Sequence, residues 1–123
     1  IVIIPSVSRS EYLSIISKAD IGLVSLSKNL SSHNYPLKMI GYMQHSLPLL
    51  ASVNENNEII NLIKKKNIGL VSGAGDIEAF NKNLSTIIND KNLRLFQGKN
   101  SLDLYNHRFN VKIAANKISK HAN

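Results

Sequence analysis

The chain has 123 residues, which is enough for one domain with a single core but too few for two. It contains no Cys, which excludes disulfides and thiolate metal sites, and no apolar stretch is long enough to span a bilayer. The formal net charge of +7, from 15 basic and 8 acidic residues, favours an anionic partner such as a phosphorylated ligand, a nucleic acid or an acidic membrane surface.

The first third of the chain alternates apolar runs with helical patterns. Residues 1–4 are apolar and mostly β-branched, which predicts a buried strand. A capping-box pattern at 8–11 predicts a helix that runs to about residue 19, and the apolar run at 21–26 predicts a second strand. After a polar loop at 27–35, Pro36 suits the first turn of a helix ending near residue 44.

The remaining two thirds repeat this alternation. Residues 47–52 and 68–71 predict two more strands, separated by a helix over 54–66. The last turn of that helix holds a basic run, Lys64-Lys65-Lys66, whose cations suit the negative end of a helix dipole. A turn at 72–75 follows. Three further helices are predicted: one capped by Asp76, one over 93–105 with a break or bend near Gly98, and a terminal helix over 111–123.

Short apolar strands separated by helices predict an α/β fold, with a parallel sheet of about four strands covered on both faces. Such sheets bind ligands at the carboxyl ends of their strands, so we expect the functional residues in the loops there. Walker A, GxGxxG and GxSxG motifs are absent, and the four His residues lack the spacing of metal ligands. Because no aromatic ladder accompanies the basic residues, we expect no nucleic-acid partner.

The helix that begins at Pro36 is the most informative element. Its N-terminus would present free backbone N–H groups at the carboxyl edge of the sheet, where they attract phosphate. Lys38 and Gly41 are three residues apart and share one helix face, so Lys38 could project toward the same ligand. From the spacing alone, a solvated surface lysine is the favoured interpretation.

The stretch from residue 35 to 52 resembles the donor-binding signature of retaining glycosyltransferases of family 4, which have the GT-B fold. The flanking segments resemble that family in order, over nearly the whole chain, around residues 8–25, 68–79 and 92–109. The matching residues within the signature are Pro36-Leu37-Lys38, Tyr42-Met43, Pro48 and Ala51-Ser52.

The resemblance implies transfer of a sugar, with an N-acetylhexosamine from a UDP-sugar as our prediction, to a glycan or polyprenyl-linked acceptor in bacterial O-antigen or lipopolysaccharide biosynthesis. In this interpretation Lys38 contacts the diphosphate, while Val7 and Ser8 lie against the nucleotide base. No metal and no cofactor are expected, because cations and backbone amides stabilise the departing diphosphate.

Two family glutamates map onto residues that are not acidic, His33 and Gly41. His33 could hydrogen-bond a sugar hydroxyl, or it could be a solvated loop histidine. Gly41 has no side chain with which to bind ribose, and we hypothesise that Glu55 supplies that contact from nearby.

The resemblance also implies that residues 1–123 form one partial domain of a Rossmann-like fold, whose first two strands and N-terminal acceptor domain lie elsewhere. We therefore expect this segment alone to be inactive, with an exposed strand edge that favours self-association or a strand swap. The expected location is cytoplasmic, with peripheral contact to the inner face of the plasma membrane.

Two alternatives to a transferase stay open. One is a sugar-nucleotide epimerase of the same fold, whose donor site is built similarly. The other is a degenerate, non-catalytic binding module with a basic surface, which the missing glutamates favour. Binding that collapses between low and moderate salt would indicate the electrostatic module.

Overall fold

The computed structural model describes residues 3–27 and 36–109. Within them, three parallel strands form one sheet in the order β1 (Gly22–Ser25), β2 (Leu49–Val53) and β3 (Gly69–Gly73). The register pairs Gly22 with Leu49 and Leu49 with Gly69. The predicted α/β architecture with a parallel sheet is confirmed.

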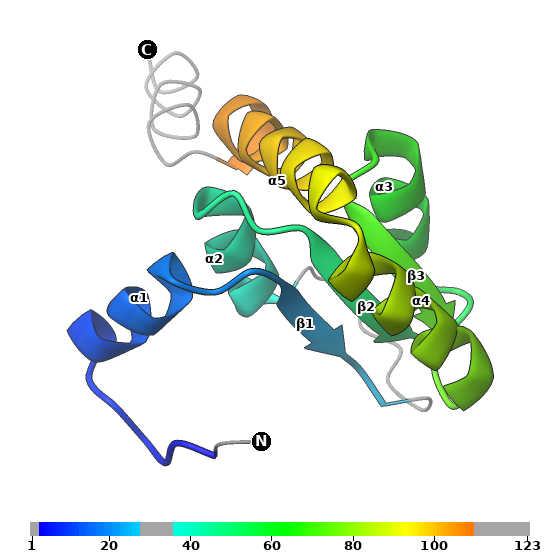
Figure 1. The fold of residues 1–123 in the computed structure, drawn as a ribbon, viewed down its shortest axis with the longest axis horizontal. Coiled ribbons are helices and arrows are strands. Elements are labelled where there is room, and N and C mark those ends of the chain that lie inside the picture. Colours follow the sequence, from blue (N-terminus) through cyan, green and yellow to red (C-terminus); the bar gives the residue numbers. More distant parts are fainter. Residues whose placement is uncertain (1–2, 28–35, 110–123) are drawn as a thin grey trace, which may run out of the picture.

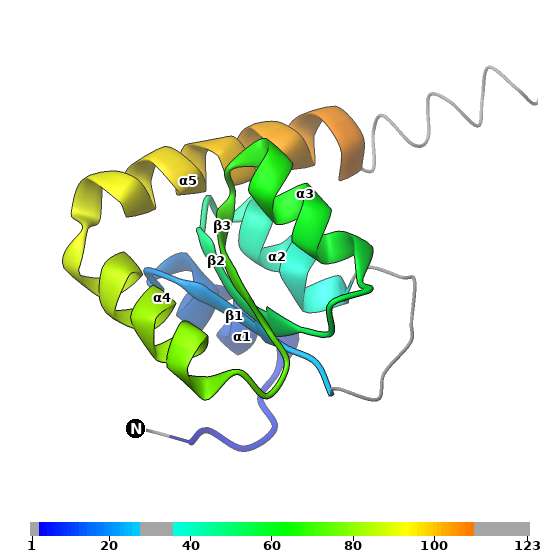
Figure 2. The same cartoon turned by 90° about the vertical axis from the view of Figure 1, so that its right-hand side faces the viewer.

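Helices flank the sheet on both faces (Figures 1 and 2). Two of them, α2 and α3, lie on one face, α4 lies on the other, and α5 crosses the amino edge of the sheet. A π-helical segment, η1, follows α5 directly. None of the helices in the described ranges is both long and apolar enough to cross a membrane. The helical elements are α1 (Arg9–Ser17), α2 (Leu37–Gln44), α3 (Glu58–Lys66), α4 (Ile77–Asn89), α5 (Lys91–Leu104) and η1 (Tyr105–Phe109).

The core lies mainly between the sheet and the helices α2 and α3. Two methionines of α2, Met39 and Met43, are fully buried together with Val24 of β1, while Ile59 and Ile63 of α3 join the same cluster. Each such side chain stabilises the fold by about 2 kcal/mol through removal of apolar surface from water. The packing holds α2 rigidly against the sheet, which fixes the position of its N-terminus.

Capping side chains explain where the helices begin. The Ser8 Oγ accepts a hydrogen bond from the Glu11 N–H at 3.3 Å, and the Asp76 carboxylate accepts one from the Ala79 N–H at 3.1 Å, as the sequence predicted. Helix α3 begins at Glu58 instead of residue 54, because the buried Asn57 side chain caps it through the Ile59 N–H at 3.0 Å.

The predicted strand over residues 1–4 is wrong for the part that is described. Ile3 and Ile4 are 86% and 54% exposed and pair with no strand, so the described sheet has three strands instead of about four. An apolar run becomes a strand only where a neighbouring strand accepts its hydrogen bonds, and here none does. Residues 28–35 of the predicted polar loop and the predicted helix over 111–123 lie outside the described residues.

Helix α5 also differs from its prediction, because it runs unbroken through Gly98. A Cβ at this position would lie 2.2 Å from the Ser46 carbonyl oxygen, and Ser46 itself adopts a left-handed backbone conformation with φ 58°. The glycine therefore lets the helix approach the α2–β2 turn closely, and it does not mark a bend.

Helix α1 lies beside α2, where the two tyrosines Tyr12 and Tyr42 interact. Burial, followed by the effect of Tyr12, raises the pKa of Tyr42 above its ordinary value of 10.0. The folded state therefore favours the neutral phenol, and this contribution to stability is complete below the ordinary pKa. It is lost as the pH rises through the higher, folded-state pKa.

We accordingly expect the free energy of unfolding to fall as the pH rises past the ordinary pKa of 10.0, and to fall less in Tyr42→Phe. Denaturant unfolding at a series of pH values measures this difference. If the free energy of unfolding depended on pH identically in the wild type and in Tyr42→Phe, the Tyr42 phenol would not contribute to the pH dependence of stability.

Candidate functional site

The N-terminus of α2 differs from the other helix starts in the described residues. A side-chain oxygen caps each of the four other α-helices, but none of the side chains in the described ranges caps α2. Its N-cap residue is Pro36, which has no polar side chain to offer. The Met39 N–H donates to the Pro36 carbonyl at 3.1 Å, but no described side chain occupies the N–H groups of Leu37 and Lys38, which can face an anionic ligand at the carboxyl edge of the sheet.

Lys38 stands in the first turn of this helix. Its side chain is exposed, and so is that of Leu37, at 85%. The next residue, Met39, is fully buried and anchors the turn in the core. The positive helix end and the Lys38 ammonium thus lie on a rigid element, which is the arrangement that a fixed phosphate contact requires.

Gly41, one turn further along, has open space above its Cα. An ideal Cβ built there meets nothing within 4 Å among the described atoms. Its carbonyl oxygen lies 2.9 Å from the Nδ1 of His45, so the glycine backbone is engaged although it has no side chain. A longer side chain at position 41 would extend into this space.

The two residues expected at the nucleotide base directly precede α1. Val7 is half-buried, while Ser8 is exposed and its hydroxyl caps the helix through Glu11. A contact of these residues with a ligand would therefore use mainly backbone atoms. His33 lies outside the described residues.

Glu55 is exposed in the loop after β2 and lies beside the end of β3. A Cβ built on Gly73 would be 4.0 Å from its Oε1 atom. Glu55 lines a cavity of about 320 Å³ together with Lys64, Ser72 and Asp76. The structure thus places Glu55 at the β3–α4 turn. Lys38, Val7 and Ser8 do not line this cavity, so the predicted site residues do not all surround one cavity.

A feature that sequence reasoning missed is a row of hydroxyls across the carboxyl end of the sheet. Ser25, Ser52 and Ser72 are register partners on the three adjacent strands. Ser72 is buried and donates a hydrogen bond to the Ala51 carbonyl, but Ser25 and Ser52 line a cavity of about 220 Å³. The remaining lining residues of that cavity are Leu23, Gly75, Asp76, Ile77 and Phe80. Only the strand register aligns these serines.

Comparison with known proteins identifies no relative. No protein-family model, no curated protein and no solved structure matches the chain.

The part of the chain that the structure describes contains no evident metal-binding site. No three His, Asp or Glu side chains gather there as metal ligands would. The expectation that the site uses no metal stays a prediction.

Proposed function

We propose that the chain is the donor-binding part of a retaining glycosyltransferase that uses a UDP-sugar, with an N-acetylhexosamine as the transferred sugar. The observation that supports this most directly is the uncapped N-terminus of α2 beside the exposed Lys38, at the carboxyl edge of a parallel sheet. Because that edge is where α/β sheets bind ligands, the same place suits the diphosphate of a sugar nucleotide.

The proposed chemistry depends on stabilising charge that develops as the diphosphate departs. The N–H groups of Leu37 and Lys38 and the Lys38 ammonium are donors fixed before the reaction begins, and preorganised donors lower the barrier most. The Ser25 and Ser52 hydroxyls offer further hydrogen bonds to a hydroxyl-rich ligand at the same edge. In this proposal the acceptor, a glycan or polyprenyl-linked sugar of bacterial surface polysaccharide, binds to a second domain.

The proposal is tested by equilibrium binding of a panel of UDP-, GDP- and dTDP-sugars to the chain, and by transfer from the same donors with the intact protein that includes the acceptor domain. One UDP-sugar should bind with clear preference and be competed by UDP. Failure of every nucleotide sugar to bind would contradict the proposal. It would favour the non-catalytic binding module, for which the open, side-chain-free surface at Gly41 is the specific observation.

The variant Gly41→Glu tests whether this surface lost a ribose contact. Because nothing within 4 Å obstructs a Cβ there, the glutamate should be accepted without strain and reach toward the ligand from the same helix face as Lys38. A carboxylate that accepts a ribose hydroxyl should tighten donor binding by about tenfold. The measurement is calorimetric titration with the preferred UDP-sugar, with Gly41→Gln as the uncharged control.

Unchanged affinity in Gly41→Glu would show that residue 41 does not face the ribose. The proposed compensating role of Glu55 is then the next to examine. The variant Glu55→Gln should weaken binding of a ribonucleotide sugar if the carboxylate holds the ribose.

A further inference from the structure

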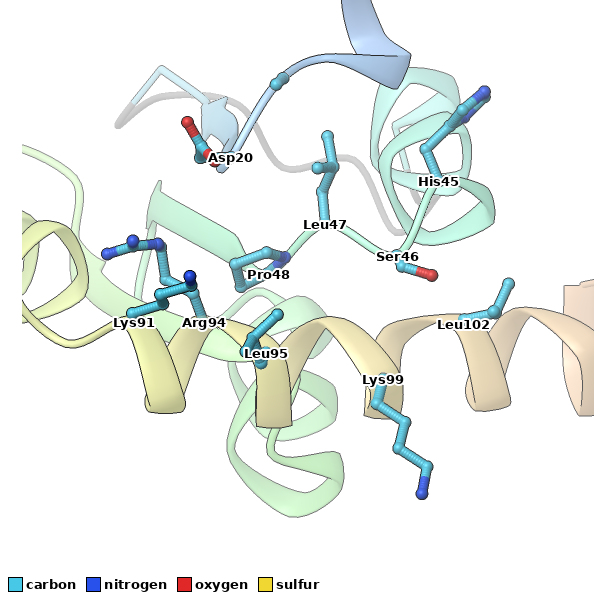
Figure 3. A pocket seen from close by; sticks show the side chains of 11 residues that line it. Asp20, His45, Ser46, Leu47, Pro48, Lys91, Arg94, Leu95, Lys99 and Leu102 are labelled. Atoms are coloured by element: carbon cyan, nitrogen blue, oxygen red, sulfur yellow. The ribbon is translucent and has the colours of Figure 1, made fainter.

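A third cavity, of about 340 Å³, lies far from the candidate donor edge (Figure 3). It opens at the amino edge of the sheet, between α5 and the turn that joins α2 to β2. Its apolar wall includes Leu47 and Pro48, both buried. The other lining residues are Ala19, Asp20, His45, Ser46, Lys91, Arg94, Leu95, Lys99 and Leu102.

Three cations of α5 belong to this lining, against one carboxylate, that of Asp20. The heads of Lys91 and Arg94 extend on the same side of the hollow, whereas Lys99 points away from it, along the outside of the helix (Figure 3). The Arg94 Nη1 donates to the Ile87 and Ile88 carbonyls at 2.8 and 2.5 Å, so this guanidinium also closes the end of α4. The cavity and the adjoining helix surface are therefore positively charged overall.

The same surface of α5 exposes large apolar side chains. Leu95 and Phe96 are 62% and 56% exposed. The chain has only three Phe and no Trp, so one of its few large aromatic side chains lies on this surface. Lys91, Leu95 and Lys99 are spaced four apart and form one stripe along the helix, with Phe96 beside it. The opposite face of α5, with Gln97 and Ser101, is buried against β3, so the stripe faces outward.

Besides Asp20 of the cavity lining, two acidic residues of the α5 segment lie near this stripe and limit its charge. The Asp90 carboxylate accepts the Leu93 N–H at 2.9 Å as the cap of α5. Asp103 follows Lys99 by four residues on the same face and offsets part of its charge. Lys91 is therefore the cation on which an anionic partner should depend most.

We propose that this α5 surface docks on a membrane containing anionic phospholipids. In the docked state Leu95 and Phe96 enter the headgroup region, while the Lys91 and Lys99 stems extend so that their ammonium groups meet lipid phosphates. The basic cavity receives a phosphate headgroup between Lys91 and the α2–β2 turn. The inference does not depend on the proposed donor chemistry, since it concerns the opposite edge of the sheet.

The exposed apolar pair, Leu95 and Phe96, favours an anionic membrane over other anionic partners. A free phosphate or a nucleic-acid backbone would use the cations, but it would gain nothing from Leu95 and Phe96. An anionic lipid surface uses both groups, because its interface offers charge and hydrocarbon within one side-chain length.

The test is co-sedimentation of the full chain with vesicles of phosphatidylglycerol and phosphatidylcholine, compared with vesicles of phosphatidylcholine alone. We expect binding only to the anionic vesicles. Lys91→Gln should lower the partition coefficient about fivefold, and Phe96→Ser about tenfold. Lys65→Gln and Ile77→Ser are the matched controls, because Lys65 is an exposed lysine of α3 and Ile77 is a 72% exposed isoleucine of α4.

Circular dichroism of each variant verifies the fold, which should persist because both replaced α5 side chains are exposed. Loss of binding in Lys91→Gln but not in Phe96→Ser would overturn the proposal, since the surface would then bind phosphate without docking. An equal effect of Lys65→Gln and Lys91→Gln, or equal binding to both kinds of vesicle, would overturn it too.

Discussion

Replacing Lys38 with alanine should weaken binding of the preferred UDP-sugar by about thirtyfold, which is the usual effect of removing a charged hydrogen-bond partner. The Lys38 side chain is exposed and belongs to the first turn of α2, so its removal leaves the buried contacts of Met39 and Met43 in place. Calorimetric titration gives the affinity, and the melting temperature of the variant should be unchanged.

Lys82→Ala is the control for this experiment. Lys82 is also an exposed helical lysine, but it stands on α4, so its removal lowers the net charge equally without touching the α2 N-terminus. If Lys82→Ala weakened binding as much as Lys38→Ala, general electrostatics and not a local phosphate contact would explain the affinity.

The variant Gly69→Ala should destabilise the fold by about 3 kcal/mol, because an added methyl group has no room between the central and last strands. A Cβ at Gly69 would lie 2.0 Å from the Leu49 carbonyl oxygen, which is an atom of the neighbouring backbone and cannot move aside as a side chain can. The Gln97 amide also donates to the Gly69 carbonyl at 3.2 Å, so a shift of β3 would disturb α5 as well.

Thermal and denaturant unfolding measure this loss, for which we expect a fall in melting temperature of about 10 °C. Gly41→Ala is the matched control: it adds the same methyl group in open space within a helix and should stabilise the fold by about 0.5 to 1 kcal/mol. A melting temperature for Gly69→Ala equal to that of the wild type would show that the strands are not packed as closely as described.

The alternation of strands and helices was predictable because it depends on local patterns. Apolar runs and caps such as Ser8 and Asp76 are read within a few residues, and the structure confirms the helices that these two residues cap and the three strands predicted after residue 20. The α2 helix could be placed for the same reason, since proline at a helix start has a local cause.

Features that depend on distant partners could not be predicted in the same way. Residues 3 and 4 have the composition of a strand, but strand formation needs a neighbour that local composition does not report. Gly98 suggested a bend, whereas its actual reason is the Ser46 carbonyl, 52 positions earlier in the chain. These errors have one cause, which is that pairing and close packing are properties of the tertiary structure.

The candidate site likewise combines features that local sequence determines with features that depend on distant residues. Lys38 and the helix start at Pro36 come from one short segment, so their proximity follows from the sequence. The alignment of Ser25 with Ser52, by contrast, depends on strand register, and the position of Glu55 beside Gly73 depends on how a loop folds over β3.

The most direct test of the central claim is a titration of the isotope-labelled chain with a UDP-N-acetylhexosamine, followed by the backbone amide resonances. If the diphosphate binds at the uncapped end of α2, the largest shifts should fall on the N–H groups of Leu37 and Lys38, and the Lys38→Ala variant should need about thirtyfold more ligand to reach the same shifts. Shifts that concentrate on α5 or on Lys64-Lys65-Lys66 instead, or the absence of any shift at millimolar ligand, would contradict a donor site at this helix end.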